Sequence, residues 1–354
     1  MNHLRLVVVG LGWIGRKHAQ VVQDSGHCAL AGVCDLDDAH AAFADECGVP
    51  FSTDLDALLA ETKPDGAIIA TANGSHGTVT ECCARHGVHV LVEKPVADTL
   101  DEAQGIITAA DAAGIRGLVG HHRRHSPLIR EARSLVADGT LGKLVGVSML
   151  WALCKPDDYF DVEWRRRRPG GGPVFINLIH ELDCLRFICG DIRRVYAEGS
   201  TDARGLPVED TLGITLSFKS GAVGSILASD TTPAPWSYEA TTGENPHYFH
   251  TAENCYHFLG TEGSLAFPRL ELWRHADERR GWQYPLEKSS SSVSAGDPIA
   301  IQLEHFCRVI RGEEEPLIDA RDGAHSLAAA LAVIESIETR APVEVAGLEM
   351  ENRG

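Results

Sequence analysis

A glycine-rich turn near the start of the chain constrains its fold more than any other feature. The apolar run LRLVVV leads directly into GLGWIG, with glycines at Gly10, Gly12 and Gly15. A second apolar run, CALAGVC, is followed by Asp35. A strand, this glycine spacing, a helix over 13–23 and an acid at the tip of the next strand together predict a parallel α/β unit that binds a dinucleotide.

The glycines have separate physical roles in such a turn. Gly10 permits the tight turn, Gly12 lets the backbone approach a pyrophosphate, and Gly15 lets the helix pack close to the strand. Trp13 and Ile14 lie at the helix start, where free N–H groups and the positive end of the helix dipole favour phosphate. A strand–helix turn without a ligand is the alternative explanation.

Length and charge bound the class of protein. At 354 residues the chain exceeds the size of a single core, so two domains are expected. The net charge of −18 argues against a nucleic-acid partner, and the basic run 165–168 is too short to reverse it. There is no apolar stretch of about 18 residues, so no membrane partner is expected.

The N-terminus and the cysteines indicate a cytoplasmic protein. The chain enters a predicted strand by Leu4, which leaves no room for a signal peptide. Its ten cysteines show no C-x-x-C spacing and are expected to be reduced thiols, most of them buried.

The first 120 residues alternate apolar runs with amphipathic segments. This pattern predicts a doubly wound parallel sheet with helices on both faces. Thr99 and Glu102 form a capping-box pattern, and Gly114 stands where a helix C-cap belongs. Besides the strands and helix already named, strands are expected over 65–71, 88–93 and 115–120, and helices over 54–61, 76–86 and 100–113.

The pattern changes after about residue 120. Strand-like runs separated by turns predict an α+β domain with a large, open, mostly antiparallel sheet, and SSSSVSAG at 289–296 reads as an exposed loop. Helices are expected over 173–188, 299–310 and 322–339. The predicted boundary gives a dinucleotide-binding domain at 1–122 and a substrate-binding and oligomerisation domain at 123–354.

A lysine follows the predicted strand at 88–93. Ligands of doubly wound sheets bind beyond the carboxyl ends of the strands, so Lys94 is expected near the reactive end of a bound dinucleotide. Pro95 fixes an extended or turned backbone directly after it. Lys94 could bond a substrate oxygen during hydride transfer; a solvated strand-end lysine is the alternative.

Taken together, these motifs resemble the Gfo/Idh/MocA oxidoreductase family over nearly the whole chain. The motifs are GLGWIG followed by His18, ATANGSH, HVLVEKP, HHRRHSP, GGGPVFINLIHELD and PLIDARDGAHSL, in that order. The resemblance implies a Rossmann domain joined to an α+β domain with a large open sheet. Its members oxidise or reduce sugars, polyols and related compounds with a nicotinamide cofactor.

The resemblance also implies roles for particular residues. The lysine of the EKP motif and the histidine of the glycine-led helix work at the substrate, which makes Lys94 and His180 the expected catalytic residues. The expected cofactor contacts are Gly10, Gly12, Trp13, Ile14, Gly15, Asp35, Thr71, Asn73, His76, Glu93 and Lys94.

The helix that carries His180 departs from the family in one position. Many members have an aspartate four residues before the histidine, where this chain has Ile176. Asn177 is the nearest polar side chain; on an α-helix it shares a face with His180 and Cys184, while Val174, Leu178, Leu182 and Leu185 form an apolar stripe. Asn177 would orient substrate, and the usual route for the proton is incomplete.

Other substrate contacts are expected around the same helix. The full set is Arg123, Lys155, Tyr159, Trp164, Arg165, Asn177 and His180. Trp164 and Arg165 are expected nearer the nicotinamide than Arg167 and Arg168. The segment 235–250, rich in aromatic and amide groups, is a further candidate or a subunit contact. No metal site is expected, because His121, His122 and His125 lack supporting ligands.

These observations predict an NAD-dependent dehydrogenase or reductase of a hydroxylated small molecule bound in a cleft between the domains. Asp35 favours NAD over NADP, because it can accept bonds from a ribose 2′-hydroxyl and repels a 2′-phosphate. A homodimer or homotetramer formed through the open sheet is expected. The alternatives are a redox-neutral hydrolase or epimerase with tightly held NAD and a non-catalytic dinucleotide-dependent regulator.

Overall fold

The computed structural model describes residues 3–168 and 170–347 and divides into two compact units. The first unit runs to His125 and also takes in Asp297–Leu327, whereas the second holds Ser126–Gly296 and Ala328–Gly347. The segment Asp297–Leu327 therefore packs with the first unit, whereas a single boundary after residue 122 assigns it to the second. The end of the expected second domain, 348–354, lies outside the described residues.

A six-stranded parallel sheet forms the centre of the first unit. Its order, β3-β2-β1-β4-β5-β6, is that of a doubly wound nucleotide-binding sheet. All five strand pairs are parallel. The strands are β1 (Leu4–Val9), β2 (Cys28–Cys34), β3 (Phe51–Ser52), β4 (Gly66–Ile69), β5 (His89–Val92) and β6 (Gly117–Val119).

Helices cover both faces of this sheet. Helix α4 contacts both α3 and α5, and α1 contacts α9. A side chain at Gly66 would lie 2.8 Å from Ile310, which shows how closely α9 approaches the strands. The helices are α1 (Trp13–Asp24), α2 (Ala41–Cys47), α3 (Leu55–Thr62), α4 (His76–Arg85), α5 (Leu100–Ala113) and α9 (Pro298–Arg311), with 3-10 turns η1 (Asp38–His40), η2 (Asn73–Ser75) and η3 (His122–His125).

Two local signals in the first unit are confirmed by the structure. The Thr99 hydroxyl oxygen accepts from the backbone N–H of Glu102, and the Glu102 carboxylate accepts from the backbone N–H of Thr99. The capping box is therefore complete. Gly114 ends α5 with φ of 66°, the left-handed conformation that favours glycine.

The second unit is built on a nine-stranded sheet of order β14-β13-β12-β11-β7-β10-β9-β8-β15. Seven of its eight pairs are antiparallel, and β10 pairs with β7 in parallel. The parallel pair arises because the chain leaves β7 by a long connection and returns through the β8–β9–β10 meander. The strands are β7 (Leu144–Ala152), β8 (Ile192–Ser200), β9 (Thr211–Phe218), β10 (Val223–Ser229), β11 (Tyr256–Gly260), β12 (Ser264–Phe267), β13 (Glu271–His275), β14 (Leu286–Ser290) and β15 (Val343–Glu344).

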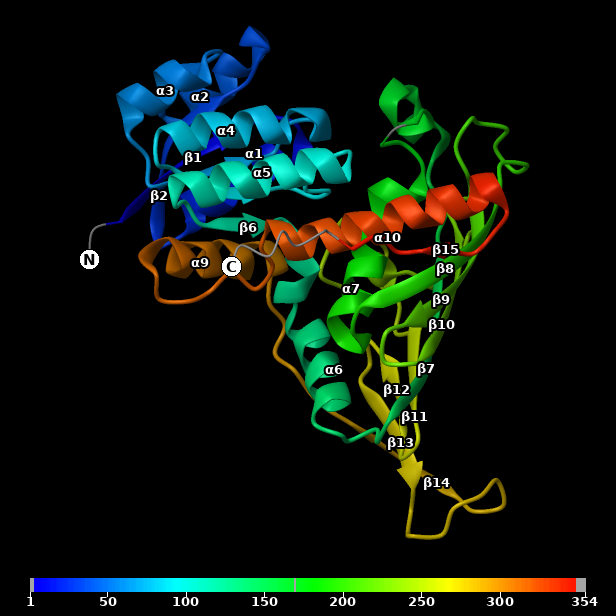
Figure 1. The fold of residues 1–354 in the computed structure, drawn as a ribbon. Coiled ribbons are helices and arrows are strands. Elements are labelled where there is room, and N and C mark those ends of the chain that lie inside the picture. Colours follow the sequence, from blue (N-terminus) through cyan, green and yellow to red (C-terminus); the bar gives the residue numbers. More distant parts are fainter. Residues whose placement is uncertain (1–2, 169, 348–354) are drawn as a thin grey trace, which may run out of the picture. The chain divides into compact units, whose positions relative to one another are not determined.

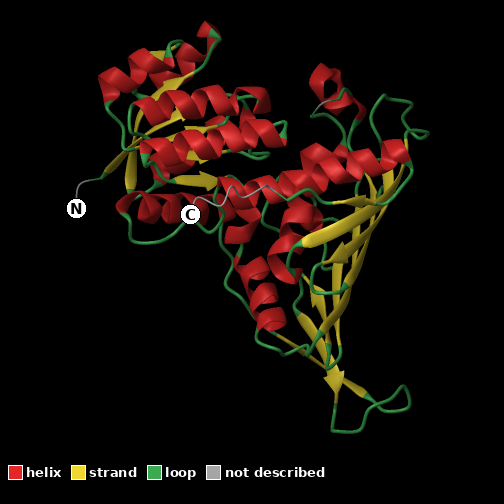
Figure 2. Cartoon of the chain, viewed as in Figure 1, coloured by secondary structure: helices red, strands yellow, loops and turns green. Residues whose placement is uncertain are grey.

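Within the second unit, helices gather on one face of this sheet, as Figures 1 and 2 show. Arg133 of α6 stacks over Phe187 of α7 at 4.0 Å from the ring centre. The unit's helices are α6 (Pro127–Ala137), α7 (Ile179–Cys189), α8 (Tyr238–Thr242) and the later part of α10 (Ala320–Thr339), with short helical turns η4 (Asp157–Asp161), η5 (Glu163–Arg166) and η6 (Val174–Leu178).

The other face of the nine-stranded sheet carries exposed apolar side chains. Register places Val223, Leu259 and Trp273 in one row across neighbouring strands, linked through Gly146 and Ser264. Their exposed fractions are 58%, 44% and 37%. Among the described residues no helix lies over this face (Figure 1).

One expectation about local structure in the second unit is wrong in part, and the structure refines another. Ser289 and Ser290 belong to strand β14 and pair with Leu272 and Glu271, so the polar segment is not a loop throughout. The expected helix at 173–188 begins with a π-helical turn, η6, in which the backbone N–H of Ile179 bonds the Val174 carbonyl. A π turn holds an extra residue, and such turns often mark functional positions.

Candidate functional site

The glycine turn of the first unit has the backbone that its sequence predicts. Gly10 has φ of +90°, and a side chain there would meet the Ala70 carbonyl oxygen at 2.6 Å. A side chain at Gly15 would lie 1.8 Å from the carbonyl oxygen of Gly10. Both positions therefore require glycine for the fold itself.

Gly12 is different, and it supplies the test of whether a dinucleotide fits. A side chain at Gly12 would meet nothing within 4 Å, so the fold does not require glycine there. Gly12 is also the N-cap of α1, where no side chain caps the helix and no acidic residue stands in the first turn. The start of α1, with Trp13 66% exposed and Ile14 partly exposed, is thus accessible, and a helix N-terminus of this kind suits a pyrophosphate.

Asp35 lies at the tip of β2 and contacts the same turn. Its carboxylate accepts from the backbone N–H of Leu11 at 2.6 Å and of Asp37 at 3.0 Å, and it pairs with His40 at 3.1 Å. Burial alone would raise the pKa of Asp35, but these backbone bonds and His40 lower it. His40 thus lies beside the Asp35 carboxylate, although the sequence pattern around Asp35 gives no sign of this contact.

Glu93, at the end of β5, is an internal anchor for the EKP segment. One carboxylate oxygen accepts from Nε2 of His18 at 2.8 Å and the other from the backbone N–H of Lys94 at 3.1 Å. Burial would raise the pKa of Glu93, yet the His18 bond and the nearby charges of His122 and Lys94 lower it to about 2. The side chain of Lys94 is half-buried, and the Lys94–Pro95 bond is cis.

The ATANGSH segment lies between β4 and α4. His76 is fully buried, with its ring nitrogens 3.0 Å from the Pro95 carbonyl and 3.2 Å from the Thr71 carbonyl. Burial lowers the pKa of His76. The imidazole thus braces the loop after β4 against the EKP segment, while Thr71 and Asn73 are half-buried beside it.

In the second unit, His180 lies in the first turn of α7, just after the π turn. His180 is 7% exposed and Cys184 is fully buried. The apolar stripe is confirmed, since Val174, Leu178, Leu182 and Leu185 are all fully buried. The predicted face shared by Asn177 and His180 assumed α-helical spacing, whereas Asn177 stands in the wider π turn.

Two buried carboxylates hold this helix in place. Glu209, 2% exposed, accepts from the backbone N–H of Val174 at 3.4 Å and from Arg168 at 3.0 Å. Glu181, next to His180, accepts from the hydroxyl of Tyr256 on β11. These contacts hold the turn before α7 and the first turn of α7 itself.

Lys155 follows β7 and is buried, although the sequence suggested a substrate-facing cation. Its Nζ donates to Oδ1 of Asn177 at 2.8 Å and lies 3.4 Å from Oδ2 of Asp230. Burial lowers the pKa of Lys155, and Asp230 opposes this effect. Lys155 therefore contacts Asn177, another predicted substrate residue, directly.

The remaining predicted substrate residues fall into two groups. Arg165 stacks over Tyr159 at 4.2 Å and donates to the Tyr159 carbonyl at 2.9 Å, while Trp164 is 54% exposed. Burial raises the pKa of Tyr159. Arg123 lies in η3 of the first unit and is 4% exposed, so it is not an open surface cation. Arg167 and Arg168 pair with carboxylates, Glu163 at 2.6 Å and Glu209 at 3.0 Å.

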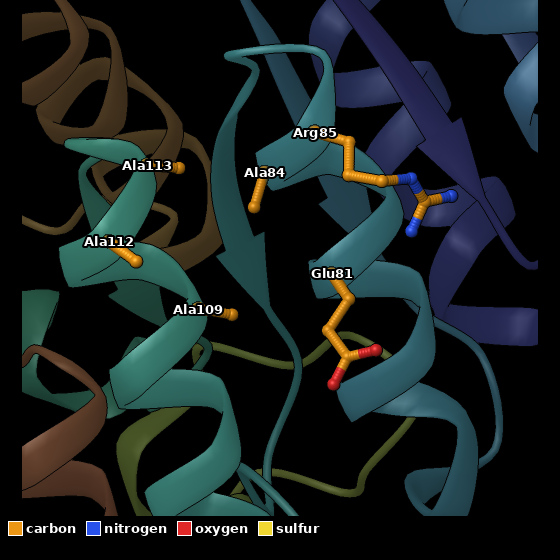
Figure 3. Close-up of a pocket in the computed structure, with 6 residues that line it drawn as sticks. All are labelled: Glu81, Ala84, Arg85, Ala109, Ala112 and Ala113. Atoms are coloured by element: carbon orange, nitrogen blue, oxygen red, sulfur yellow. The ribbon is translucent and has the colours of Figure 1, made fainter.

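Two hollows were found in the separate units. One, of about 410 Å³, lies between α4 and α5 and contains none of the predicted site residues; Figure 3 shows three alanines of α5 facing Ala84 while Glu81 and Arg85 point away. The other, of about 490 Å³, adjoins the segment after β7. Its lining is Cys154, Lys155, Asp157, Phe160, Asp161, Arg166, Ala203, Arg204, Leu206 and Thr231.

One group of metal-ligand types occurs among the described residues. Asp56, Cys82 and His86 place one ligand atom each within 4.8 Å of one another. Asp56 already pairs with Arg85 at 3.5 Å and His86 at 3.0 Å on the surface. The expected absence of a metal stays a prediction.

Comparison with known proteins places both halves of the chain in one family. The model described as "Oxidoreductase family, NAD-binding Rossmann fold" matches residues 4–121, and that described as "Oxidoreductase family, C-terminal alpha/beta domain" matches residues 133–345. The chain belongs to the Gfo/Idh/MocA oxidoreductase family. It is therefore an oxidoreductase with an NAD-binding Rossmann domain.

Curated relatives of this Gfo/Idh/MocA protein include two sugar-active enzymes. The 1,5-anhydro-D-fructose reductase of Ensifer adhaerens is 29% identical, over 86% of this chain and 87% of the relative. The D-xylose 1-dehydrogenase (NADP(+)) 2 of Haloferax volcanii is 28% identical, over 96% and 98%. A crystal structure of an Agrobacterium radiobacter oxidoreductase with NAD⁺, L-tartaric acid and magnesium has the same fold, with a TM-score of 0.82, 20% identity and coverage of 97% and 99%.

Sequence reasoning missed several polar residues of this Gfo/Idh/MocA chain. The sequence marks His18 only as part of a motif and gives no individual role to Glu209, Asp230 or Arg204. A weak signal exists for Asp230, because an isolated charge directly after an apolar strand pattern needs a buried partner. The partners of these residues are far apart in sequence, so the pairing itself could not be inferred.

Proposed function

We propose that this protein is an NAD-dependent dehydrogenase or reductase of a sugar, polyol or related hydroxylated small molecule. The observation that carries the proposal is the uncapped start of α1 at Gly12, which suits a dinucleotide pyrophosphate. The sugar-active relatives, aligned over most of their length, support the substrate class.

Lys94 and His180 are the proposed proton-handling side chains. Bound NAD would accept hydride from a carbinol carbon of the substrate. His180 is the proposed acceptor of the hydroxyl proton, and Lys94 is the proposed hydrogen-bond donor to substrate, so that oxidation yields a carbonyl, the reduced cofactor and one proton. The bond of Glu93 to the Lys94 backbone, and the bond of Glu181, the neighbour of His180, to Tyr256, support these roles.

The proposed cofactor preference is NAD over NADP. The anionic carboxylate of Asp35 lies at the tip of β2 and bonds the backbone of Leu11 within the glycine turn. Such a carboxylate favours a ribose 2′-hydroxyl and repels a 2′-phosphate.

Substrate contacts are proposed for the segment after β7 and for the π turn. Trp164 offers an exposed indole, and Tyr159 with Arg165 forms a stacked polar pair on the same segment. Trp164 and Arg165 are the proposed residues nearer the nicotinamide, because Arg167 and Arg168 are held in ion pairs.

A homodimer or homotetramer formed through the exposed face of the nine-stranded sheet is also proposed. The row of Val223, Leu259 and Trp273 is apolar and exposed, and an open sheet of this kind is stabilised when a second layer covers it. A cytoplasmic location is supported by the ten cysteines, all of them free thiols.

A cofactor-reduction screen tests the proposal. Purified protein is mixed with NAD or NADP and D-xylose, myo-inositol or other polyols, or with NADH or NADPH and 1,5-anhydro-D-fructose. The gain or loss of reduced-nicotinamide absorbance is then followed. Turnover with NAD and a sugar or polyol is expected. Conversion of a sugar without added cofactor and without net reduction would instead indicate the redox-neutral alternative.

A further inference from the structure

The side-chain amide of Asn177 is held in one orientation by a buried cation. Lys155 donates from Nζ to Oδ1 of Asn177 at 2.8 Å. An ammonium group is only a donor, so the amide must turn its oxygen toward Lys155 and its NH2 group away. The usual ambiguity of amide orientation is thereby resolved by chemistry.

The opposite end of this amide is open to a ligand. Among the residues that the structure describes, none accepts a hydrogen bond from the amide nitrogen of Asn177. This nitrogen is also not among the buried polar atoms without a partner, so it is accessible to solvent. Asn177 as a whole is 9% exposed. A nearly buried side chain thus presents two N–H donors, and little else, to the solvent side.

Lys155 cannot leave this position easily. Its ammonium also lies 3.4 Å from Asp230, a buried carboxylate, and 4.9 Å from the ring centre of Tyr159. Asp230 is in turn held by Arg204, from Nε at 3.1 Å. Lys155 is 7% exposed, so its ammonium group contacts protein side chains rather than solvent.

We propose that Asn177 is a fixed hydrogen-bond donor to an oxygen of the substrate and that Lys155 is the positioning residue that fixes it. This inference rests on the proposed dehydrogenase function for the identity of the ligand as a polyhydroxylated compound. It assigns a specificity: the substrate must place an acceptor oxygen, from a hydroxyl, ring ether or carboxylate, against Asn177. It also changes the expected role of Lys155 from contacting substrate to holding the residue that does.

Two substitutions separate donor chemistry from folding. Asn177→Asp keeps the contact with Lys155 as an ion pair but replaces the exposed N–H donors with an acceptor oxygen. Lys155→Met keeps a long apolar stem and leaves Asp230 paired with Arg204, yet frees the amide to turn. Lys219→Met is the matched control, since Lys219 is 62% exposed and its ammonium pairs with Asp191 on the surface.

The first measurement uses no cofactor. The side-chain NH2 resonances of Asn177, assigned by their loss in Asn177→Asp, are followed during titration with D-xylose, myo-inositol and glycerol. We expect at least one of these polyols to shift them, with binding about tenfold weaker in Lys155→Met and unchanged in Lys219→Met. The inference is overturned when none of the three polyols moves the resonances, or when Lys155→Met binds like the parent protein.

Steady-state kinetics with the substrate found in the screen give the second measurement. Asn177→Asp and Lys155→Met should raise KM by about tenfold while kcat changes far less, the pattern of lost substrate binding. A purely structural role for Lys155 would lower the melting temperature and leave KM as it was. Turnover with unaltered KM in both variants rejects the donor, whereas polyol binding without any turnover rejects only the dehydrogenase function.

Discussion

The ring of His18 and the carboxylate of Glu93 form a buried pair, with 2.8 Å between Nε2 and Oε1. His18 belongs to α1, which begins at the glycine turn, and Glu93 directly precedes Lys94. A side chain at Gly120 would come within 2.9 Å of Glu93, so the carboxylate is also enclosed by the chain after β6. The pair thus connects the helix of the dinucleotide turn with the segment that carries the proposed catalytic lysine.

Glu93→Gln should weaken both the fold and turnover. The folded-state pKa of Glu93 is about 2, below its ordinary value of 4.5. Its carboxylate therefore stabilises the native state above about pH 4.5, and this stabilisation is lost as the pH falls toward 2. Denaturant unfolding from pH 7 to pH 3 should show lower stability at pH 7 and a flatter acid decline in the variant.

Turnover by Glu93→Gln is expected to fall by at least about tenfold, because Lys94 loses the charged acceptor of its backbone N–H. Glu61→Gln, on the surface at α3, is the control and should behave like the parent protein. A variant that keeps parental kcat and the parental acid decline would show that the pair has no positioning role.

The glycines of the turn should separate by function. Gly15→Ala brings a methyl group into the Gly10 carbonyl and should lower the melting temperature or prevent folding. Gly12→Ala meets no protein atom, so its melting temperature without cofactor should match the parent. Isothermal titration with NAD should nevertheless show binding weakened by about tenfold or more in Gly12→Ala, since the methyl group blocks close approach of the pyrophosphate. Unchanged NAD affinity in Gly12→Ala would show that the pyrophosphate does not bind at this turn.

The sequence predicts much of the nucleotide-binding sheet and its helices, because these signals are local, but it does not predict that Asp297–Leu327 joins the first unit. The apolar runs matched the strands β1 and β2 residue for residue, and the capping box of Thr99 and Glu102 fixed the start of α5. The family motifs also led to membership in the oxidoreductase family.

The relations that build the site were not available from sequence, because they join distant residues. His18 and Glu93 are 75 positions apart, and Lys155 meets Asp230 only because β10 returns beside β7 in parallel. The π turn was missed for another reason. Alpha-helical spacing fits VFINLIHELD well, and no residue in this segment indicates the extra residue that widens the turn around Asn177.

Asp35→Ser should shift cofactor use toward NADP. The substitution removes the negative charge at the tip of β2 while leaving a small polar group, and it frees His40 as a partner for a 2′-phosphate. We expect the ratio of kcat/KM for NAD to that for NADP to fall by about tenfold or more, as expected from loss of one nearby charge. Equal efficiencies in the parent protein would contradict the proposed preference at the outset.

A charge on the exposed sheet face should disrupt the proposed oligomer. Leu227 of β10 is 56% exposed and lies two rows from Val223 on the same face. Leu227→Glu would place a carboxylate inside an apolar interface, so light scattering at micromolar concentration should return a mass near the 38.2 kDa of one chain. Glu61→Gln, at an exposed position on α3 of the first unit, is the control. A parent protein that already has the mass of one chain would reject the oligomer.

Lys94→Ala and His180→Ala should damage turnover more than any other single changes. A positioned general acid or base contributes about 10²–10⁴-fold, so kcat should fall by that factor while NAD affinity is largely kept. His180 is the preferred proton acceptor because an unperturbed imidazole titrates near neutrality, whereas Ile176 offers no group to share the proton. His27→Ala, at an exposed histidine before β2, is the control. Near-parental turnover in His180→Ala together with none in Lys94→Ala would make the lysine the sole acid–base group, and the pH profile of His180→Ala would then keep its parental shape.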